Sequence, residues 1–169
     1  KVFDVLRKYL QVEGECFASP LNRRLKKFYS AFPDTDQCFG SLGSFFSPNN
    51  SRMVGSWECN PPFDVKSVKN TIDKIKNLLE TAESLDEALS FAVFFAQFSS
   101  QSEVMQSVRK LQKFLRAETT VVDHVYLYGF QHRFNRGGDK HWRPDRPTSV
   151  FLFQSSFGFV KYCRGKRSE

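Results

Sequence analysis

The stretch Gly55-Ser56-Trp57-Glu58-Cys59-Asn60-Pro61-Pro62-Phe63 decides the fold of this chain. Its first five residues have the pattern of a short strand, and an amphipathic helix begins near Asp64, directly after the stretch. Each proline fixes its own φ, carries no N–H and pushes the residue before it into an extended conformation. The stretch therefore ends in a stiff corner between a strand and a helix. Ligands bind at that edge of α/β sheets.

The side chains of this corner suit one kind of chemistry. The amide oxygen of Asn60 and the carbonyl oxygen of Pro61 are two acceptors at one point, which fits an amine with two hydrogens. Phe63 offers a flat face for a flipped-out base, so we predict a transferase that aims an adenine amino nitrogen at a methyl donor. The alternative is a rigid turn with Phe63 in the core, because short motifs also arise by chance. The predicted catalytic residues are Asn60, Pro61, Pro62 and Phe63, which together are called the tetrad.

Two long elements follow the corner. Apolar residues step by three and four over 65–82, which predicts one helix with Asp64 as its N-cap. Residues Ala88–Ala96 are nearly all apolar, which predicts a strand buried on both faces at the centre of a parallel sheet. Gln97 and Phe98 stand at the carboxyl end of that strand.

The N-terminal part has the pattern of a nucleotide-binding α/β unit. A helix over about residues 2–11 and a buried strand over 15–18 precede Ser19, a good N-cap, and Pro20, a favoured first helical residue. We expect a second helix from Pro20 to Phe32, with its N-terminus toward a ligand. The turn has no glycine, so by itself it fits an ordinary strand-to-helix connection as well. The apolar face of this helix would be Leu21, Leu25, Phe28 and Phe32.

The segment between this helix and the tetrad strand is rich in turn residues. It has room for one short strand near Gln37–Ser41. Asp34 and Asp36 suit a hydrogen bond to a ribose hydroxyl or, equally, ordinary turn chemistry. Phe39 and Gly40 are candidates to flank a planar ring.

The C-terminal half continues the alternation of helices and strands. Ser102 is expected to cap a helix whose inward residues run from Val104 to Leu115. Strands are predicted over 119–128, 149–154 and 158–162. This order of elements indicates an α/β fold with a mostly parallel sheet and antiparallel C-terminal strands.

Composition narrows the class of partner. The chain has 169 residues, 40% of them hydrophobic, which suits one domain with its own core. Its formal net charge is +7 and its pI is about 9.3, which favours nucleic acid as a partner. A membrane surface is the second partner that this charge would suit. No run of about 18 apolar residues exists, so we expect no membrane span. Four scattered cysteines without Cys-x-x-Cys spacing argue against zinc and favour a reducing compartment.

A basic loop over residues 131–146 leaves the strand at 119–128 on the same edge as Asn60. It holds five Arg and Lys residues interleaved with two aromatic residues. Such loops contact phosphates and stack on bases, so we predict RNA binding; the alternative is a solvated loop. Its two histidines lack companion ligands at suitable spacing, so no metal is expected. The RNA-contacting residues expected here are Arg133, Arg136, Lys140 and Arg143.

Four blocks of sequence stand in a distinctive order: Glu15-Cys16-Phe17-Ala18-Ser19-Pro20-Leu21-Asn22, Ser30-Ala31-Phe32-Pro33-Asp34-Thr35-Asp36, Phe39-Gly40-Ser41 and Asn60-Pro61-Pro62-Phe63. Together they resemble the methyltransferase domain of the phosphorylated-CTD-interacting-factor family, the cap-specific adenosine N6-methyltransferases. The resemblance implies a Rossmann-like class I methyltransferase fold. It covers residues 1–162 as one catalytic domain and leaves 163–169 as a basic tail.

The resemblance also implies ligands and partners. The methyl donor would be S-adenosylmethionine, and the substrate an mRNA whose cap-adjacent nucleotide is 2′-O-methyladenosine. RNA polymerase II C-terminal repeats would be reached through regions outside this chain. The location would be nuclear, with a cytoplasmic one as the alternative. The donor-binding residues expected from the blocks are Phe17, Ala18, Ser19, Pro20, Asn22, Asp34, Asp36, Phe39, Gly40 and Asn60.

Two departures from the family pattern leave alternatives open. Val65 replaces an acidic residue of the family, and Gln97 and Phe98 replace part of a charged, Trp-containing segment. All three stand where the resemblance places substrate contacts. The chain is therefore such a methyltransferase, a catalytically inactive RNA-binding or scaffolding homologue, or an adenine-N6 methyltransferase acting on DNA or internal RNA.

Overall fold

The computed structural model describes residues 2–96, 103–122, 126–127, 141–142 and 146–163. Its main strands are β1 (Gly14–Ala18), β2 (Lys27–Ser30), β3 (Gly55–Cys59), β4 (Leu89–Ala96), β5 (Leu115–Val121) and β8 (Thr148–Gln154). β6 (Tyr126–Leu127) and β7 (His141–Trp142) pair as a second, two-stranded sheet. The helices are α1 (Val2–Leu10), α2 (Pro33–Asp36), α3 (Val65–Ser84), α4 (Glu103–Arg109) and α5 (Ser156–Cys163), with 3-10 turns η1 (Gln37–Phe39) and η2 (Gln112–Phe114).

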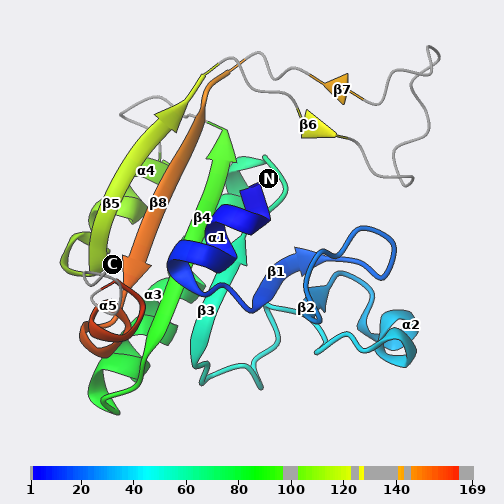
Figure 1. Ribbon diagram of the computed structural model, residues 1–169, viewed down its shortest axis with the longest axis horizontal. Coiled ribbons are helices and arrows are strands. Elements are labelled where there is room, and N and C mark those ends of the chain that lie inside the picture. Colours follow the sequence, from blue (N-terminus) through cyan, green and yellow to red (C-terminus); the bar gives the residue numbers. More distant parts are fainter. Residues whose placement is uncertain (1, 97–102, 123–125, 128–140, 143–145, 164–169) are drawn as a thin grey trace.

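The main sheet has the strand order β2-β1-β3-β4-β8-β5. Strands β2, β1, β3 and β4 run parallel, and β8 is antiparallel to both of its neighbours. Helices α1 and α5 cover one face, and α3 and α4 cover the other (Figure 1). The sequence prediction of a mostly parallel α/β sheet with antiparallel C-terminal strands is confirmed.

The order in which the chain adds strands to the sheet reverses after β2, and the reversal point lies between β1 and β3. From β1 it moves outward to β2, and then it crosses back to add β3 and β4 on the other side. In open α/β sheets such a reversal marks the point where ligands bind, at the carboxyl ends of the strands.

An aromatic cluster fills the space between the sheet and α3. Phe45 lies at its centre with only 2% of its surface exposed. Its ring centroid is 5.4 Å from that of Phe17, 5.9 Å from Tyr29 and 6.4 Å from Phe91, mostly edge to face. Such contacts add to the burial energy of the rings. The segment between β2 and β3 is thereby fixed to the sheet beside the reversal point.

Helix α3 begins where the sequence predicts. Asp64 has extended backbone angles, and its Oδ1 accepts a hydrogen bond of 2.8 Å from the N–H of Ser67. This N-cap satisfies one of the donors left free at a helix start. The helix then buries an apolar stripe that includes Val68, Ile72 and Ile75 against the sheet.

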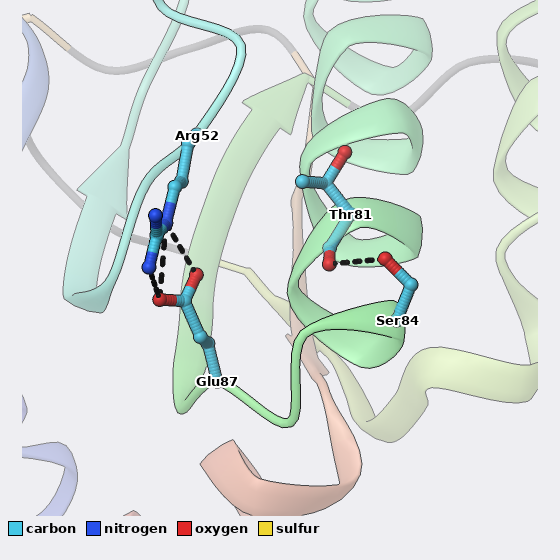
Figure 2. Close-up of polar contacts among 4 residues, drawn as sticks. All are labelled: Arg52, Thr81, Ser84 and Glu87. Atoms are coloured by element: carbon cyan, nitrogen blue, oxygen red, sulfur yellow. Dashed lines mark hydrogen bonds and ion pairs between the residues drawn. The ribbon is translucent and has the colours of Figure 1, made fainter.

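An ion pair joins the two segments that lead into β3 and β4. The Nε of Arg52 is 3.0 Å from each carboxylate oxygen of Glu87, and the Nη2 of Arg52 also contacts this carboxylate (Figure 2). Nearby, the hydroxyl of Ser84 donates to the carbonyl of Thr81 at the end of α3. Since Arg52 is exposed, the pair contributes at most about 1 kcal/mol.

Two predictions for the N-terminal part are wrong. The expected helix from Pro20 to Phe32 is a connection followed by β2, and the expected strand near Gln37–Ser41 is replaced by α2 and η1. Helix formation is prevented because the N–H groups of Arg24 and Leu25 donate to the side chain of Glu15. The adjacent residues Phe28 and Tyr29 are both buried, as expected for a strand covered on both faces.

The C-terminal part also differs from expectation. The predicted strand over 158–162 is helix α5, because the Oγ of Ser155 accepts from the N–H of Gly158 and caps a helix. The predicted strand over 119–128 is replaced by β5, which begins earlier at Leu115, and by β6. Leu115 has helical spacing from Leu111 but pairs with β8 instead.

We expect Gly158→Ala to destabilise the protein by about 1–3 kcal/mol, although alanine favours helices. A Cβ at Gly158 would overlap the carbonyl oxygen of Leu89, a backbone atom of β4 that has little room to move. The measurement is urea unfolding, with Val160→Ala on the exposed side of the same helix as the control. Equal stability of G158A and the native chain would contradict this close contact of helix and sheet.

None of the described helices is both long enough and apolar enough to cross a membrane.

Candidate functional site

Three segments meet one edge of the sheet, at the carboxyl ends of β2, β1 and β3. The connection over residues 19–26 follows β1, the α2–η1 segment follows β2, and Asn60 follows β3. Strands β1 and β3 are neighbours, with Glu15 opposite Glu58 in the register. The first connection and Asn60 therefore flank the reversal point, and the α2–η1 segment lies one strand farther out.

Asn60 has a buried oxygen with no bonding partner. Its Oδ1 is inaccessible to solvent and makes no hydrogen bond within the described part of the chain. A buried polar atom left without a partner costs about 1–3 kcal/mol, so such atoms are rare in native proteins. The oxygen of Asn60 is thus an acceptor held ready for a donor that the described residues do not supply.

The other three residues of the tetrad differ in burial. Pro61 is buried and Pro62 is exposed. Phe63 is half-buried and packs against the main hydrophobic cluster, so the expectation that it serves only the core holds in part. Val65, the first residue of α3, is 47% exposed and does not take part in the core.

The turn after β1 is closed by its own polar groups. The N–H of Ser19 donates to the Oδ1 of Asn22 at 2.8 Å, and the Ser19 hydroxyl accepts from the N–H of Leu21 at 3.3 Å. The carbonyl of Ser19 accepts from the N–H groups of Asn22 and Arg23. These bonds give a fixed, glycine-free turn beside the partly buried Ala18 and Pro20. The neighbouring Phe17 ring lies 5.5 Å from that of Phe46.

A buried carboxylate holds the remainder of this connection. Glu15 is 4% exposed, and its Oε1 accepts from the N–H of Arg24 at 2.6 Å and of Leu25 at 2.8 Å. Burial raises the pKa of Glu15, and the two N–H groups oppose that rise. Parallel strands are usually joined by a dozen or more residues, often a helix. Here residues 19–26 suffice because the side chain of Glu15 replaces the bonding that a helix would provide.

Glu58 lies beside Glu15 on the same face of the sheet. It is 6% exposed, and burial, together with the charge of Glu15, raises its pKa to about 8. Glu15 keeps its charge more readily because it accepts two backbone N–H groups. This pair is not among the residues predicted from sequence, although a glutamate inside an apolar strand is itself a signal, since such residues are rarely buried without a partner.

The two cysteines of these strands are inert at neutral pH. Cys16 and Cys59 are buried, and burial raises the pKa of both thiols. A thiol that stays protonated is neither a nucleophile nor a metal ligand. The described residues contain no group of three or more His, Cys, Asp or Glu side chains able to hold a metal ion.

The expected ribose- and ring-binding residues share the edge but lie farther from Asn60. Asp34 and Asp36 belong to α2, and Phe39 is 62% exposed in η1. Gly40 ends η1 with a φ of +90°, a conformation that favours glycine. The remaining predicted contacts lie outside the described residues: Gln97, Phe98, Arg133, Arg136, Lys140 and Arg143.

The model of a protein family described as "Phosphorylated CTD interacting factor 1 WW domain" matches residues 1–132. The chain belongs to this family. Residues 1–132 include all four parallel strands, both glutamates of the buried pair and Asn60, so the family match covers the whole reversal point.

Two curated relatives carry the name "mRNA (2′-O-methyladenosine-N(6)-)-methyltransferase". The one from Homo sapiens is 33% identical over 166 residues, which are 96% of this chain and 22% of that protein. The one from Mus musculus is 33% identical over 165 residues, which are 95% of this chain and 22% of that protein. The chain spans about a fifth of the length of these relatives. The six-stranded mixed sheet is consistent with the Rossmann-like methyltransferase fold that the family resemblance implies.

We expect Glu15→Ala to lower the free energy of unfolding by about 1–3 kcal/mol, because one buried and one partly buried N–H group lose their acceptor. Glu15→Gln keeps an acceptor oxygen and should recover most of this loss. Urea unfolding of the two variants measures the difference. If E15Q were as unstable as E15A, the hydrogen bonds to Arg24 and Leu25 would not be what holds the connection.

Proposed function

We propose that the chain is the catalytic part of an S-adenosylmethionine-dependent RNA methyltransferase. Its product would be N6-methylated adenosine, with the cap-adjacent 2′-O-methyladenosine of mRNA as the preferred substrate. The observation that carries the proposal is the buried Oδ1 of Asn60 at the reversal point of the sheet, which has no hydrogen-bond partner among the described residues. The names of the 33% identical relatives support the choice of amine and RNA.

The tetrad would orient the amine. The Oδ1 of Asn60 and the carbonyl oxygen of Pro61 would accept its two hydrogens, and Phe63 would stack on the base. Holding the reacting atoms in line contributes several kcal/mol to lowering the barrier. Two oxygens fixed beside the nitrogen also stabilise the positive charge that develops on it. This scheme needs no separate general base, because the amine loses its proton to solvent after transfer.

The turn after β1 would hold the methyl donor, which supplies an electrophilic methyl group on a sulfonium sulfur. Its internal hydrogen bonds fix the turn before any ligand arrives, which lowers the entropic cost of binding. Asp34 and Asp36 would bond ribose hydroxyls, and Phe39 and Gly40 would flank the adenine ring. The full donor set is Phe17, Ala18, Ser19, Pro20, Asn22, Asp34, Asp36, Phe39, Gly40 and Asn60.

The test has two stages. Calorimetric titration with S-adenosylhomocysteine should show one saturable site, weakened by Ser19→Ala. Transfer of a labelled methyl group should then favour capped RNA that begins with 2′-O-methyladenosine over the same RNA that begins with 2′-O-methylguanosine. Donor binding without transfer to any adenosine substrate would contradict the proposed activity.

The second candidate is a non-catalytic RNA-binding homologue, which the exposed, uncharged Val65 favours. It predicts RNA binding without donor binding. Transfer to uncapped RNA or to DNA at equal rates would instead support an adenine-N6 enzyme with a different substrate. We also propose that residues 1–162 act as one catalytic domain with a basic tail, in the nucleus, and that contacts to RNA polymerase II repeats are made by regions outside this chain.

A further inference from the structure

The connection between β1 and β2 carries a concentration of positive charge. Residues 16–33 contain four basic side chains and no acidic one. All four lie within the five residues 23–27, and every one of them is exposed. The middle residue, Leu25, points inward and is 8% exposed, in the cluster beneath α1.

The backbone that presents these charges is fixed. The carboxylate of Glu15 accepts hydrogen bonds from the N–H groups of Arg24 and Leu25. The buried side chain of Leu25 anchors the chain between Arg24 and Lys26. The Nη1 of Arg23 donates to the carbonyl of Leu25 at 3.2 Å. Since Leu25 points inward, the side chains on either side of it, Arg24 and Lys26, are directed to solvent.

The four cations differ in what they already contact. Lys27 forms an ion pair of 2.8 Å with Glu13, and the guanidinium of Arg23 lies 5.3 Å from the centre of the Phe28 ring. In the part of the chain that the structure describes, the side chains of Arg24 and Lys26 make no hydrogen bond or ion pair. The same connection begins at Ser19, in the turn proposed to hold the methyl donor, and ends at the amino end of β2, where Lys27 pairs with Gly14 at the start of β1.

We propose that Arg24 and Lys26 form a binding surface for RNA phosphates at the amino end of β2, on the connection that begins in the donor turn. The inference rests on the proposed function for the choice of RNA. Because the backbone is already fixed, only the side chains of these two cations lose entropy when they meet a polyanion. Phosphate contacts of this kind are independent of base sequence. The surface would therefore bind the RNA away from the target adenosine and leave the choice of that adenosine to the tetrad.

The test compares Arg24→Gln/Lys26→Gln with the native chain, and uses Lys110→Gln/Lys113→Gln as the control. The control removes the same charge from exposed residues near η2, which leads into the amino end of β5. Binding of a short uncapped single-stranded RNA is measured from about 50 to about 200 mM salt. Each lost phosphate contact lowers the slope by about 0.7, so over this range the native affinity should fall about sevenfold more than that of R24Q/K26Q.

The outcomes separate this surface from the proposed activity, because S-adenosylhomocysteine binding is titrated on the same samples. Support requires a weaker, less salt-dependent RNA affinity in R24Q/K26Q, a smaller effect in K110Q/K113Q and unchanged donor affinity. If the native chain bound RNA in this way but no donor, the surface would stand and the methyltransferase proposal would fail. Equal effects in the two variants, or a matching loss of donor affinity in R24Q/K26Q, would overturn the assignment of these residues to RNA.

Discussion

Replacing Asn60 with alanine is expected to lower the turnover number by at least about 10²–10³-fold, the effect of removing one fixed group that stabilises transition-state charge. Fold stability should not fall, and removal of the buried oxygen should raise it by up to about 1–3 kcal/mol. The reason is that the lost Oδ1 is buried and makes no hydrogen bond within the described residues, so its removal breaks no contact there. The substitution of Asn60 is thus expected to lower the activity without lowering the stability of the fold.

Ser56→Ala is the matched control for Asn60→Ala. The Oγ of Ser56 is the other side-chain oxygen in the described residues that is buried without a partner, and it lies within β3 rather than at its carboxyl end. S56A should keep full activity and, like N60A, should lose no stability. Single-turnover transfer of a labelled methyl group and urea unfolding measure the two quantities. Near-native turnover in N60A, or equal losses in N60A and S56A, would refute the assignment of Asn60 to the amine.

The elements predicted correctly from sequence carry local signals. Two consecutive prolines end β3, Asp64 caps α3, and the apolar run of β4 is too long and uniform for any surface position. Each of these signals acts within a few residues of the element that it defines, so no tertiary information is needed to interpret it. The same locality explains why Asn60 was placed correctly at the carboxyl end of a strand.

The errors arise where a distant side chain decides the local structure. The spacing of Leu21, Leu25 and Phe28 fits a helix, but Glu15 binds the backbone of the connection and redirects it into β2. In the same way, Ser155 links α5 to β4 by accepting from the N–H of Leu89, a residue far away in the sequence. Periodicity cannot reveal such contacts, because they depend on which strands become neighbours.

Some parts of the candidate site can be predicted from sequence and others cannot, for a physical reason. The tetrad combines residue types that are informative by themselves, whereas the turn after β1 obtains its rigidity from hydrogen bonds between Ser19 and Asn22. The buried pair of Glu15 and Glu58 was not predicted, because the sequence alone does not show that the two strands are adjacent. The pairing of β1 with β3 creates both the site and this pair.

Glu58→Gln is expected to stabilise the protein at alkaline pH by several kcal/mol, and at most by about 5 kcal/mol. Burial and the charge of Glu15 raise the pKa of Glu58 to about 8 from an ordinary value of 4.5. Between these values the folded protein binds more protons than the unfolded chain, so the free energy of unfolding falls as the pH rises. The stabilising effect of the neutral carboxyl is complete below about pH 4.5 and is lost as the pH passes through about 8.

Glutamine has the shape of the neutral carboxyl and does not ionise, so E58Q should lack this part of the pH dependence. Urea unfolding at about pH 5 should find E58Q and the native chain similarly stable, and at about pH 8 E58Q should be clearly the more stable. The raised pKa of Glu15 acts in the same direction but remains in both proteins, so the difference between them isolates Glu58. Parallel stability curves over this range would show that Glu58 ionises freely in the folded protein. In that case the pair beside Asn60 would contain two charges instead of one.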